Sequence, residues 1–136
     1  MPPEAAPVSV IMPAYNAAGT IVRALASIAG QTLAPSEVIV VDDGSSDGTA
    51  EIAERFAAGM GTAKLTVIRQ SNKGAGAARN RAVDAATQPY LAFLDADDEW
   101  LPTKLERSMD VMIKGDYLLV AHDYLDVTEA GDVHVD

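Results

Sequence analysis

The sequence predicts an α/β fold in which helices cover both faces of a mainly parallel central sheet. Short apolar segments alternate with amphipathic segments along most of the 136 residues. Val38–Val41 is a continuous β-branched run, which is typical of a strand buried on both faces. This alternation favours right-handed β–α–β crossovers and an α/β/α sandwich of layers. Ligands of such sheets bind in the crevice beyond the carboxyl ends of the strands, so the strand ends are the place to look for a site.

The strands are predicted from short apolar runs that are bounded by turn residues. We expect Pro13 to stop the first strand, because proline cannot donate to a ladder. The expected strands are Val8–Met12, Val38–Val41, Leu65–Ile68, Tyr90–Leu94 and Tyr117–Ala121, with one more in "VTEAGDVHV" (127–135).

The helices are predicted from apolar residues three, four or seven positions apart. The first covers Thr20–Ala29 and ends at Gly30, the second follows "DDGSSDGT" and is closed by Gly59, and the third is the Ala-rich segment 74–86. A fourth helix has Pro102 in its first turn and ends at Gly115. The apolar positions that define these helices are Ile21, Leu25, Ile28, Ile52, Phe56, Leu105, Met109 and Met112.

Composition excludes several functional classes. A formal net charge of -10 and a pI near 4.4 argue against nucleic acid as a partner and against electrostatic docking on anionic lipid. The absence of cysteine excludes disulfides, thiol catalysis and thiolate metal sites. No apolar run approaches the ~20 residues of a membrane helix, and "MPPEAAPVSV" does not resemble a signal peptide. We therefore expect a soluble, cytoplasmic protein of one domain, residues 1–136.

Acidic residues follow the second expected strand, in "DDGSSDGT". Asp42 and Asp43 come directly after Val41, and Asp47 follows four residues later. Asp, Gly and Ser favour turns, and Asp47 is a suitable N-cap for the next helix. The alternative is that one carboxylate accepts hydrogen bonds from a ligand at the crevice. This segment alone does not decide between the two.

The segment "DADDE" after the fourth strand places four carboxylates in five positions. One or two acids suit a helix N-terminus, but four repel one another. A hard cation such as Mg²⁺ or Mn²⁺ would relieve that repulsion and share its remaining positions with phosphates. In extended geometry Asp95 and Asp97 would point the same way. Metal–phosphate binding is therefore favoured over a solvated turn.

The segment "NKGAGAARN" contains half of a dinucleotide-binding fingerprint. Gly74 and Gly76 match it, but Arg79 occupies the third glycine position, so a nicotinamide site is rejected. The two glycines are expected to allow close helix approach, and Arg79 is the better candidate for a ligand contact. His122 is more plausible as a strand residue than as a catalyst.

Four segments together resemble the family 2 glycosyltransferases. "VSVIMPAYN", "EVIVVDDGSSDGT", "NKGAGAARN" and "LAFLDADDEWLP" occur in the order and approximate spacing of that family, from about Val8 to Pro102. The resemblance implies a Rossmann-like GT-A fold and the N-terminal part that binds a nucleoside-diphosphate sugar.

The resemblance also implies roles for particular residues. The positions matching the base pocket are Pro13, Ala14 and Tyr15, and Asp43 matches the aspartate that contacts the base. Arg79 matches an arginine near the nucleotide. "DADD" is similar to the D-x-D motif, which implies that Asp95 meets the nucleotide and that Asp97 and Asp98 hold Mn²⁺ or Mg²⁺.

The chain departs from the family in its last segment. The general base of an inverting member is expected in an acceptor-binding half that the chain lacks, so no catalytic residue is assigned. Asp123, Asp126 and Glu129 fall too early for that role. We expect a donor-binding portion that is incomplete at its C-terminus and binds nucleotide better than it transfers sugar. An exposed sheet edge or apolar surface would favour self-association.

Partners follow from the resemblance only in outline. A UDP-sugar is the favoured donor, and the acceptor is an unidentified saccharide or lipid-linked molecule. A longer parent protein would place the chain in the cytoplasm or at the inner face of the membrane. The alternatives are a non-catalytic nucleotide-binding module, a receiver-like signalling domain and a nucleotidyltransferase. The sequence has no lysine at a late strand end, which a receiver-like domain would need. It also has no basic loop directly after the first strand, which a nucleotidyltransferase would need.

Overall fold

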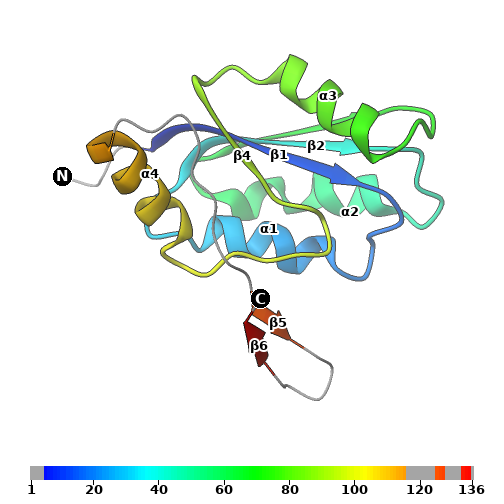
Figure 1. The fold of residues 1–136 in the computed structure, drawn as a ribbon. Coiled ribbons are helices and arrows are strands. Elements are labelled where there is room, and N and C mark those ends of the chain that lie inside the picture. The colour runs from blue at the N-terminus through cyan, green and yellow to red at the C-terminus, as the bar shows by residue number, and fades with distance from the viewer. Residues whose placement is uncertain (1–4, 116–124, 128–132, 136) are drawn as a thin grey trace.

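The computed structural model describes residues 5–115, 125–127 and 133–135. In this part of the chain a four-stranded parallel sheet has the order β3-β2-β1-β4, and helices pack against it (Figure 1). None of these helices is long and apolar enough to cross a membrane. The elements are β1 (Ala6–Ala14), α1 (Ile21–Ala29), β2 (Pro35–Asp42), α2 (Thr49–Arg55), a 3₁₀ helix η1 (Phe56–Met60), β3 (Lys64–Arg69), α3 (Ala75–Ala85), β4 (Tyr90–Phe93), α4 (Lys104–Gly115), β5 (Leu125–Val127) and β6 (Val133–Val135).

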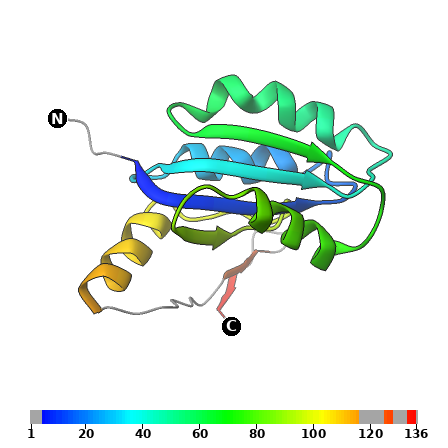
Figure 2. The same ribbon diagram turned by 90° about the horizontal axis from the view of Figure 1, so that it is seen from above.

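The predicted α/β/α sandwich is confirmed by the way side chains alternate across the two central strands. Alternate residues of β1 and β2 face opposite sides, as the two-residue period of a strand requires. One side packs against α1 and α2, the other packs against α3, and Figure 2 shows the helices on both sides. The first cluster contains Val10, Met12, Val38, Val40, Ile21, Leu25, Ile28 and Ala53, and the second contains Ile11, Ile39, Val41, Ala78 and Ala82.

The first strand continues past Pro13, so the expectation that this proline ends it is wrong. Pro13 pairs with Val41, and the last register pair joins Ala14 to Asp42. β4 pairs with β1 only from Val8 to Ile11. Among the described residues, β1 therefore has a partner strand on one side only near Pro13, and a proline is tolerated there.

Three helix boundaries differ from expectation. Gly59 does not close the second helix: α2 passes into η1, and Gly61, with φ +68°, follows its last residue. Pro102 precedes α4 by two residues, because the turn closed by the bond from Lys104 N to Leu101 O comes first. Asp47 is not the N-cap of α2; that position is Gly48.

The end of the chain is described in part. α4 packs Leu105 and Met109 against Ala6 and Val8 of β1, as their helical spacing predicts. The strand expected at 117–121 and the residue His122 lie outside the described residues. The last expected strand is present as β6, which pairs with β5 in an antiparallel manner.

A buried carboxylate joins the amino end of the sheet to the connection between α3 and β4. Glu37 Oε2 accepts hydrogen bonds from Ser9 Oγ (2.5 Å), Thr87 N (2.7 Å) and Thr87 Oγ1 (2.7 Å), and Gln88 N donates to Ser9 Oγ (3.1 Å). Burial by itself raises the pKa of Glu37, but these hydrogen bonds and the charge of Lys64 outweigh it and lower the pKa below the ordinary value. Glu37 is therefore charged at neutral pH and is satisfied by local donors.

We expect Glu37→Gln to lower the free energy of unfolding by about 1–3 kcal/mol, because an amide cannot accept these three bonds with the strength of a carboxylate. The folded-state pKa is lowered, so this stabilisation is present above the unfolded pKa and is lost as pH falls below about 4. Urea denaturation at pH 7 and pH 4 measures both effects. Glu54→Gln is the matched control, since Glu54 is an exposed partner of Arg69. Equal stability of the two variants at pH 7 would contradict the expectation.

Candidate functional site

A pocket of about 490 Å³ lies at the carboxyl ends of β1, β2 and β4. Its volume is within the ~300–1,000 Å³ of small-molecule sites, and its position is the one at which parallel sheets bind ligands. The lining residues are Pro13, Ala14, Tyr15, Asn16, Ala17, Thr20, Asp43, Asn72, Gly74, Ala75, Ala78, Arg79, Asp95, Ala96 and Asp97.

The fold thus brings the candidate site residues together from four distant segments. Tyr15 is 55% exposed, whereas Pro13 and Ala14 are buried at the end of β1. Of the eight residues proposed from the sequence, Asp98 alone does not line the pocket, and it belongs to the carboxylate cluster beside it. Their roles toward a ligand stay predictions. The eight are Pro13, Ala14, Tyr15, Asp43, Arg79, Asp95, Asp97 and Asp98.

Asp43 holds the loop that leads into α3. It is 3% exposed, and its Oδ1 accepts hydrogen bonds from Gln70 Nε2 (2.9 Å) and Lys73 N (2.8 Å), while its Oδ2 accepts one from Gly74 N (2.9 Å). Asn72 Nδ2 donates to the Asp43 carbonyl oxygen (3.2 Å). Burial raises the pKa of Asp43, but the three bonds and the Lys73 charge together lower it. The carboxylate is therefore an ionised anchor on the floor of the pocket.

The glycines of "NKGAGAARN" have different roles from the one expected. Gly74 has φ +99°, which strongly favours glycine, and this conformation directs its N–H to Asp43. A Cβ at Gly74 or Gly76 would meet nothing within 4 Å. Close helix approach is therefore not the reason for either glycine, and the backbone angle accounts for Gly74.

The two glycines form a matched test of this explanation. We expect Gly74→Ala to destabilise the protein by about 1–3 kcal/mol through backbone strain alone. Gly76→Ala, in the first turn of α3, should stabilise it by about 0.5–1 kcal/mol because alanine favours the helix. Thermal unfolding of both variants measures the difference, and destabilisation of the same size at both positions would show that the angle is not decisive.

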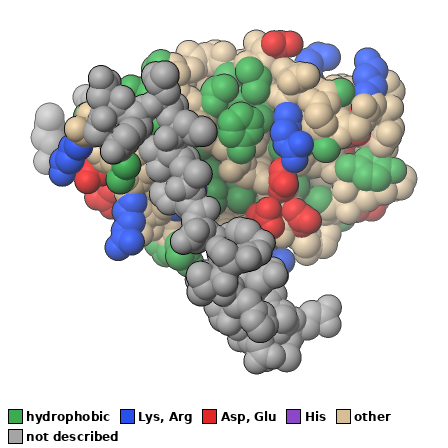
Figure 3. Space-filling view, viewed as in Figure 1, with side chains coloured by type: hydrophobic (Ala, Val, Ile, Leu, Met, Phe, Trp, Pro, Cys, Tyr) green, Lys and Arg blue, Asp and Glu red, His purple; other side chains and the backbone are tan. Residues whose placement is uncertain are grey.

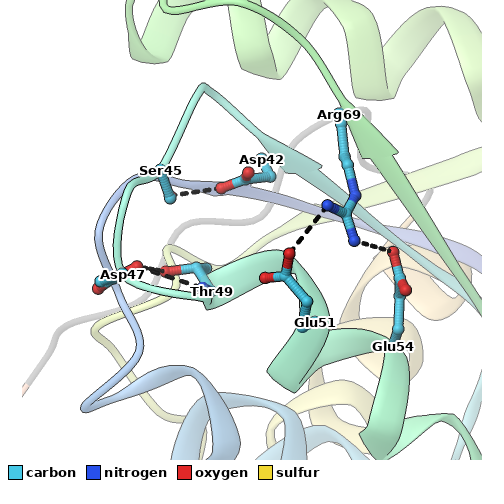
Figure 4. Close-up of polar contacts among 7 residues, drawn as sticks. All are labelled: Asp42, Ser45, Asp47, Thr49, Glu51, Glu54 and Arg69. Carbon is cyan, nitrogen blue, oxygen red and sulfur yellow. Dashed lines mark hydrogen bonds and ion pairs between the residues drawn. The ribbon is translucent and has the colours of Figure 1, made fainter.

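Hydrogen bonds between the β1–α1 and β2–α2 loops fix one wall of the pocket. Asn16 has φ +46°, and its N–H donates to Ser45 Oγ (2.7 Å) while its Oδ1 accepts from Ser46 N (2.9 Å). Ser45 in turn donates to Asp42 (Figure 4). Asn16 is suited to this place because asparagine tolerates the left-handed region. The partner loop lies about 30 positions away, so its structural role is not visible in the sequence.

Asp47 and Thr49 make further hydrogen bonds between the same two loops. Asp47 Oδ1 accepts from Thr49 N (3.2 Å) and Thr49 Oγ1 (2.5 Å), and Asp47 Oδ2 accepts from Ala18 N (3.1 Å). Thr49 Oγ1 also accepts from Ala17 N (2.9 Å). Figure 4 shows the contact between Asp47 and Thr49 beside the exposed ion pairs of Arg69 with Glu51 and Glu54. Asp47 thus has a structural role at the start of α2, although Gly48 and not Asp47 is the N-cap.

The acidic residues after β4 form a tight group in a turn. Carboxylate oxygens of Asp95, Asp97 and Asp98 lie within 4.8 Å of one another. The chain is not extended here, as the alternation argument assumed, because Asp98 N donates to Asp95 O (3.1 Å) and closes a turn. Partial burial, followed by the charges of Asp97 and Asp95, raises the pKa of Asp98. Figure 3 shows acidic side chains gathered beside a basic one on this face.

This donor set fits a hard divalent cation. Three carboxylates at short range supply oxygen ligands and negative charge. Partial burial and then the charges of Asp97 and Asp95 raise the pKa of Asp98, and a cation would offset the charge repulsion. Arg79 Nη2 lies 3.2 Å from Asp95 Oδ1 and offsets part of that charge. Both side chains are over 40% exposed, so this ion pair contributes little to stability.

Sequence reasoning missed three polar residues of the pocket region. Thr20 and Asn72 line the pocket, and Gln70 binds Asp43. Each lies in a loop or at a helix start, where hydroxyl and amide side chains are ordinary turn residues. No local signal distinguishes them, because their partners are 27 to 76 positions away.

Comparison with known proteins agrees with this geometry. Residues 9–132 match the family described as Glycosyl transferase family 2. The UDP-Glc:alpha-D-GlcNAc-diphosphoundecaprenol beta-1,3-glucosyltransferase WfgD of Escherichia coli is 39% identical over 118 residues, which is 86% of this chain and 45% of that protein. The chain spans less than half of the length of each of the curated relatives compared with it.

Two solved structures share the fold. S. aureus TarS 1-349 in complex with UDP is 32% identical, with a TM-score of 0.71 over 79% of this chain and 32% of that one. The mannosyltransferase PcManGT from Pyrobaculum calidifontis, in complex with GDP-Man and Mn2+, is 31% identical, with a TM-score of 0.71 over 82% of this chain and 33% of that one. The fold is therefore the GT-A fold, and the chain belongs to glycosyl transferase family 2.

Proposed function

We propose that this chain is the donor-binding part of an inverting glycosyltransferase that binds a nucleoside-diphosphate sugar together with Mn²⁺ or Mg²⁺. The observation that carries the proposal is the group of three carboxylates within 4.8 Å at the mouth of the strand-end pocket. The family match and the nucleotide complexes of the two neighbours support it.

The diphosphate end of the donor would lie at the acidic turn. Asp97 and Asp98 would hold the cation, Asp95 would meet the nucleotide, and Arg79 would exchange its weak ion pair with Asp95 for a phosphate oxygen. When bound, the cation would stabilise the negative charge that develops on the departing diphosphate. The Arg79 guanidinium would act on the same charge from the α3 side.

The base end of the donor would lie between β1 and Asp43. Pro13, Ala14 and Tyr15 would form the wall of the base pocket. Oδ2 of Asp43 accepts one hydrogen bond, from Gly74, and a carboxylate oxygen has room for a second. Asp43 would use that position to accept a hydrogen bond from an N–H of the base.

The reaction requires an acceptor hydroxyl oxygen to attack the anomeric carbon from the face opposite the diphosphate. The new glycosidic bond forms as the bond to the diphosphate breaks, and a carboxylate base takes the hydroxyl proton. We assign none of the described residues to that base. The family resemblance implies that it lies in an acceptor-binding region beyond the donor site.

The donor and the acceptor are proposed by class. UDP and GDP-Man are each present in one neighbour's complex, and a UDP-sugar is favoured here by the resemblance. The acceptor would be a saccharide or a lipid-linked molecule, as the name of WfgD says for that protein. A lipid-linked acceptor would suit a cytoplasmic protein at the inner face of a membrane.

The family match favours this proposal over a receiver-like domain or a nucleotidyltransferase. A non-catalytic nucleotide-binding module is the second candidate, because we assign none of the described residues to the catalytic base. Titration calorimetry of UDP, GDP and dTDP, each with and without Mn²⁺, tests the donor site. One nucleotide that binds only with the metal supports the proposal, and no binding by a folded chain contradicts it. Sugar transfer by a longer protein that contains this chain would separate the enzyme from the module.

Self-association through β4 is a further expectation. Leu91 and Phe93 are 39% and 55% exposed, and within the described residues β4 pairs on one side only, with β1. An open strand edge with exposed apolar side chains favours pairing with another copy. Sedimentation velocity should show dimers that increase with concentration and decrease in Phe93→Lys. A monomer at all concentrations would contradict this.

A further inference from the structure

One face of α1 contacts the connection between β4 and α4, which contains the acidic turn. Thr20 is the N-cap of α1, Ser27 lies within the helix and Gln31 follows its C-cap residue Gly30. Each of the three makes a hydrogen bond to this connection. The connection, residues 94–103, has no helix or strand of its own. Its backbone groups therefore need partners from elsewhere.

Thr20 supplies a partner at the acidic turn itself. Its hydroxyl donates to the carbonyl oxygen of Ala96 (2.9 Å), the residue between Asp95 and Asp97. Its other contact, with Ala17 O, is longer (3.4 Å). Thr20 occupies the N-cap position of α1 but makes no side-chain capping bond. A threonine at an N-cap usually bonds to a backbone N–H of its own helix, whereas this one bonds to a carbonyl oxygen far away in the sequence. Such departures from local rules are found at functional sites.

Ser27 and Gln31 hold the rest of the connection. Ser27 Oγ accepts from Trp100 N (3.0 Å) and donates to Ala24 O (2.7 Å). Gln31 is 8% exposed; its Nε2 donates to Leu101 O (2.7 Å) and to Ser27 O (3.0 Å), and its Oε1 accepts from Leu105 N (2.9 Å). Gln31 thus uses both ends of its amide and caps the start of α4.

We infer that Thr20 and Ser27 are positioning residues for the cation site, because their hydrogen bonds from α1 hold the turn that carries Asp95, Asp97 and Asp98. The inference rests on the proposed function for the identity of the cation. The three carboxylates lie within 4.8 Å of one another and repel, and within the turn itself the described residues show one backbone hydrogen bond, from Asp98 N to Asp95 O. The α1 contacts on either side, at Ala96 and Trp100, oppose the opening of that turn.

Removing either hydrogen bond should raise the population of the open turn. The net free energy of one hydrogen bond corresponds to an increase of about three- to tenfold. The cation binds only the gathered carboxylates, so its affinity falls in proportion to the fraction of molecules in the gathered state, by up to the same factor. Thr20→Val removes the hydroxyl and keeps the shape, and Thr20→Ser restores it. Ser27→Ala removes the partner of Trp100 N.

Ser36→Ala is the matched control. Ser36 Oγ donates to Ala6 O (2.7 Å) at the amino end of the sheet, so the variant removes a comparable hydroxyl-to-carbonyl bond far from the acidic turn. All variants are first checked for folding by circular dichroism. If Thr20→Val does not fold, Ser27→Ala tests the inference in its place, because it removes a second contact with the same connection.

Hydrogen exchange by mass spectrometry and Mn²⁺ titration with UDP are measured on the same proteins. We expect exchange in residues 94–103 to rise about three- to tenfold in Thr20→Val and Ser27→Ala, with a parallel loss of Mn²⁺ affinity, while Thr20→Ser and Ser36→Ala match the unsubstituted chain there. Unchanged exchange, or raised exchange with unchanged Mn²⁺ affinity, would overturn the inference. Absence of Mn²⁺–UDP binding by the unsubstituted chain would overturn the proposed function instead, and exchange alone would then decide whether α1 holds the turn.

Discussion

Asp43→Asn is expected to lower the free energy of unfolding by about 2–4 kcal/mol and to weaken nucleotide binding at least about tenfold. The N–H groups of Lys73 and Gly74 now donate to different oxygens of the carboxylate, at 2.8 and 2.9 Å. An asparagine amide has one oxygen and one NH2 group, so its N–H donors would face one of these two N–H groups. At this 3% exposed side chain one donor would lose its partner, and the remaining bonds would lose the charge of the carboxylate. The loop into α3 would then lose its fixed position beside the pocket.

The pH dependence of stability checks the same interaction. The pKa of Asp43 is lowered in the fold, so its contribution is present above the unfolded pKa and is lost as pH falls below about 4. Asp43→Asn should remove that part of the acid sensitivity. Asp84→Asn, an exposed carboxylate on α3, is the control and should unfold like the parent chain. If Asp43→Asn has parental stability at pH 7, the carboxylate does not anchor the loop.

Asp97→Asn is expected to weaken metal-dependent nucleotide binding by more than about a hundredfold without destabilising the fold. Loss of outer contacts around a metal costs about 10–100-fold, and loss of a ligand costs more. Asp97 is exposed and lies beside two other carboxylates. The charge of Asp97 is, after partial burial, a cause of the raised pKa of Asp98, so removing that charge relieves repulsion, and stability should stay equal or rise slightly.

Opposite responses of binding and stability distinguish a ligand from a structural residue. Calorimetry with Mn²⁺ and the nucleotide that binds most tightly measures binding. Urea denaturation without metal measures stability. Asp84→Asn again serves as the control, with both properties of the parent chain. Parental Mn²⁺ affinity in Asp97→Asn would assign the cation to other residues and would remove Asp97 from the proposed site.

Much of the fold follows from local patterns. Two elements of the structure, β2 and α1, are predicted by the β-branched run Val38–Val41 and by the helical spacing of Ile21, Leu25 and Ile28. A strand buried on both faces has a continuous apolar run, whereas a helix buried along one side has apolar residues three or four positions apart, so the two patterns differ. The boundaries were less predictable. β1 passes through Pro13 because β4 stops pairing before it, and this is a property of the neighbouring strand.

The meeting of the acidic segments could also be predicted, since parallel strands bring their carboxyl ends to one edge. The way in which each carboxylate is used could not. Asp43 and Asp97 are both acids that follow strands, yet one is buried under three hydrogen bonds and the other is exposed. The partners of Asp43 come from the loop between β3 and α3, 27 to 31 positions away, whereas Asp97 lies beside Asp95 and Asp98 of its own turn.

The sequence by itself determined the class of fold, the edge of the sheet at which a ligand would bind and the family resemblance. These depend on periodicity and on short motifs, which are contiguous in the chain. The tertiary structure alone decided that Thr20 and Ser27 hold the acidic turn, that Asp43 is an anchor and that Gly74 is needed for its backbone angle. The physical reason is that hydroxyl, amide and backbone groups have no sequence signature for a partner, and only folding selects which distant group each one meets.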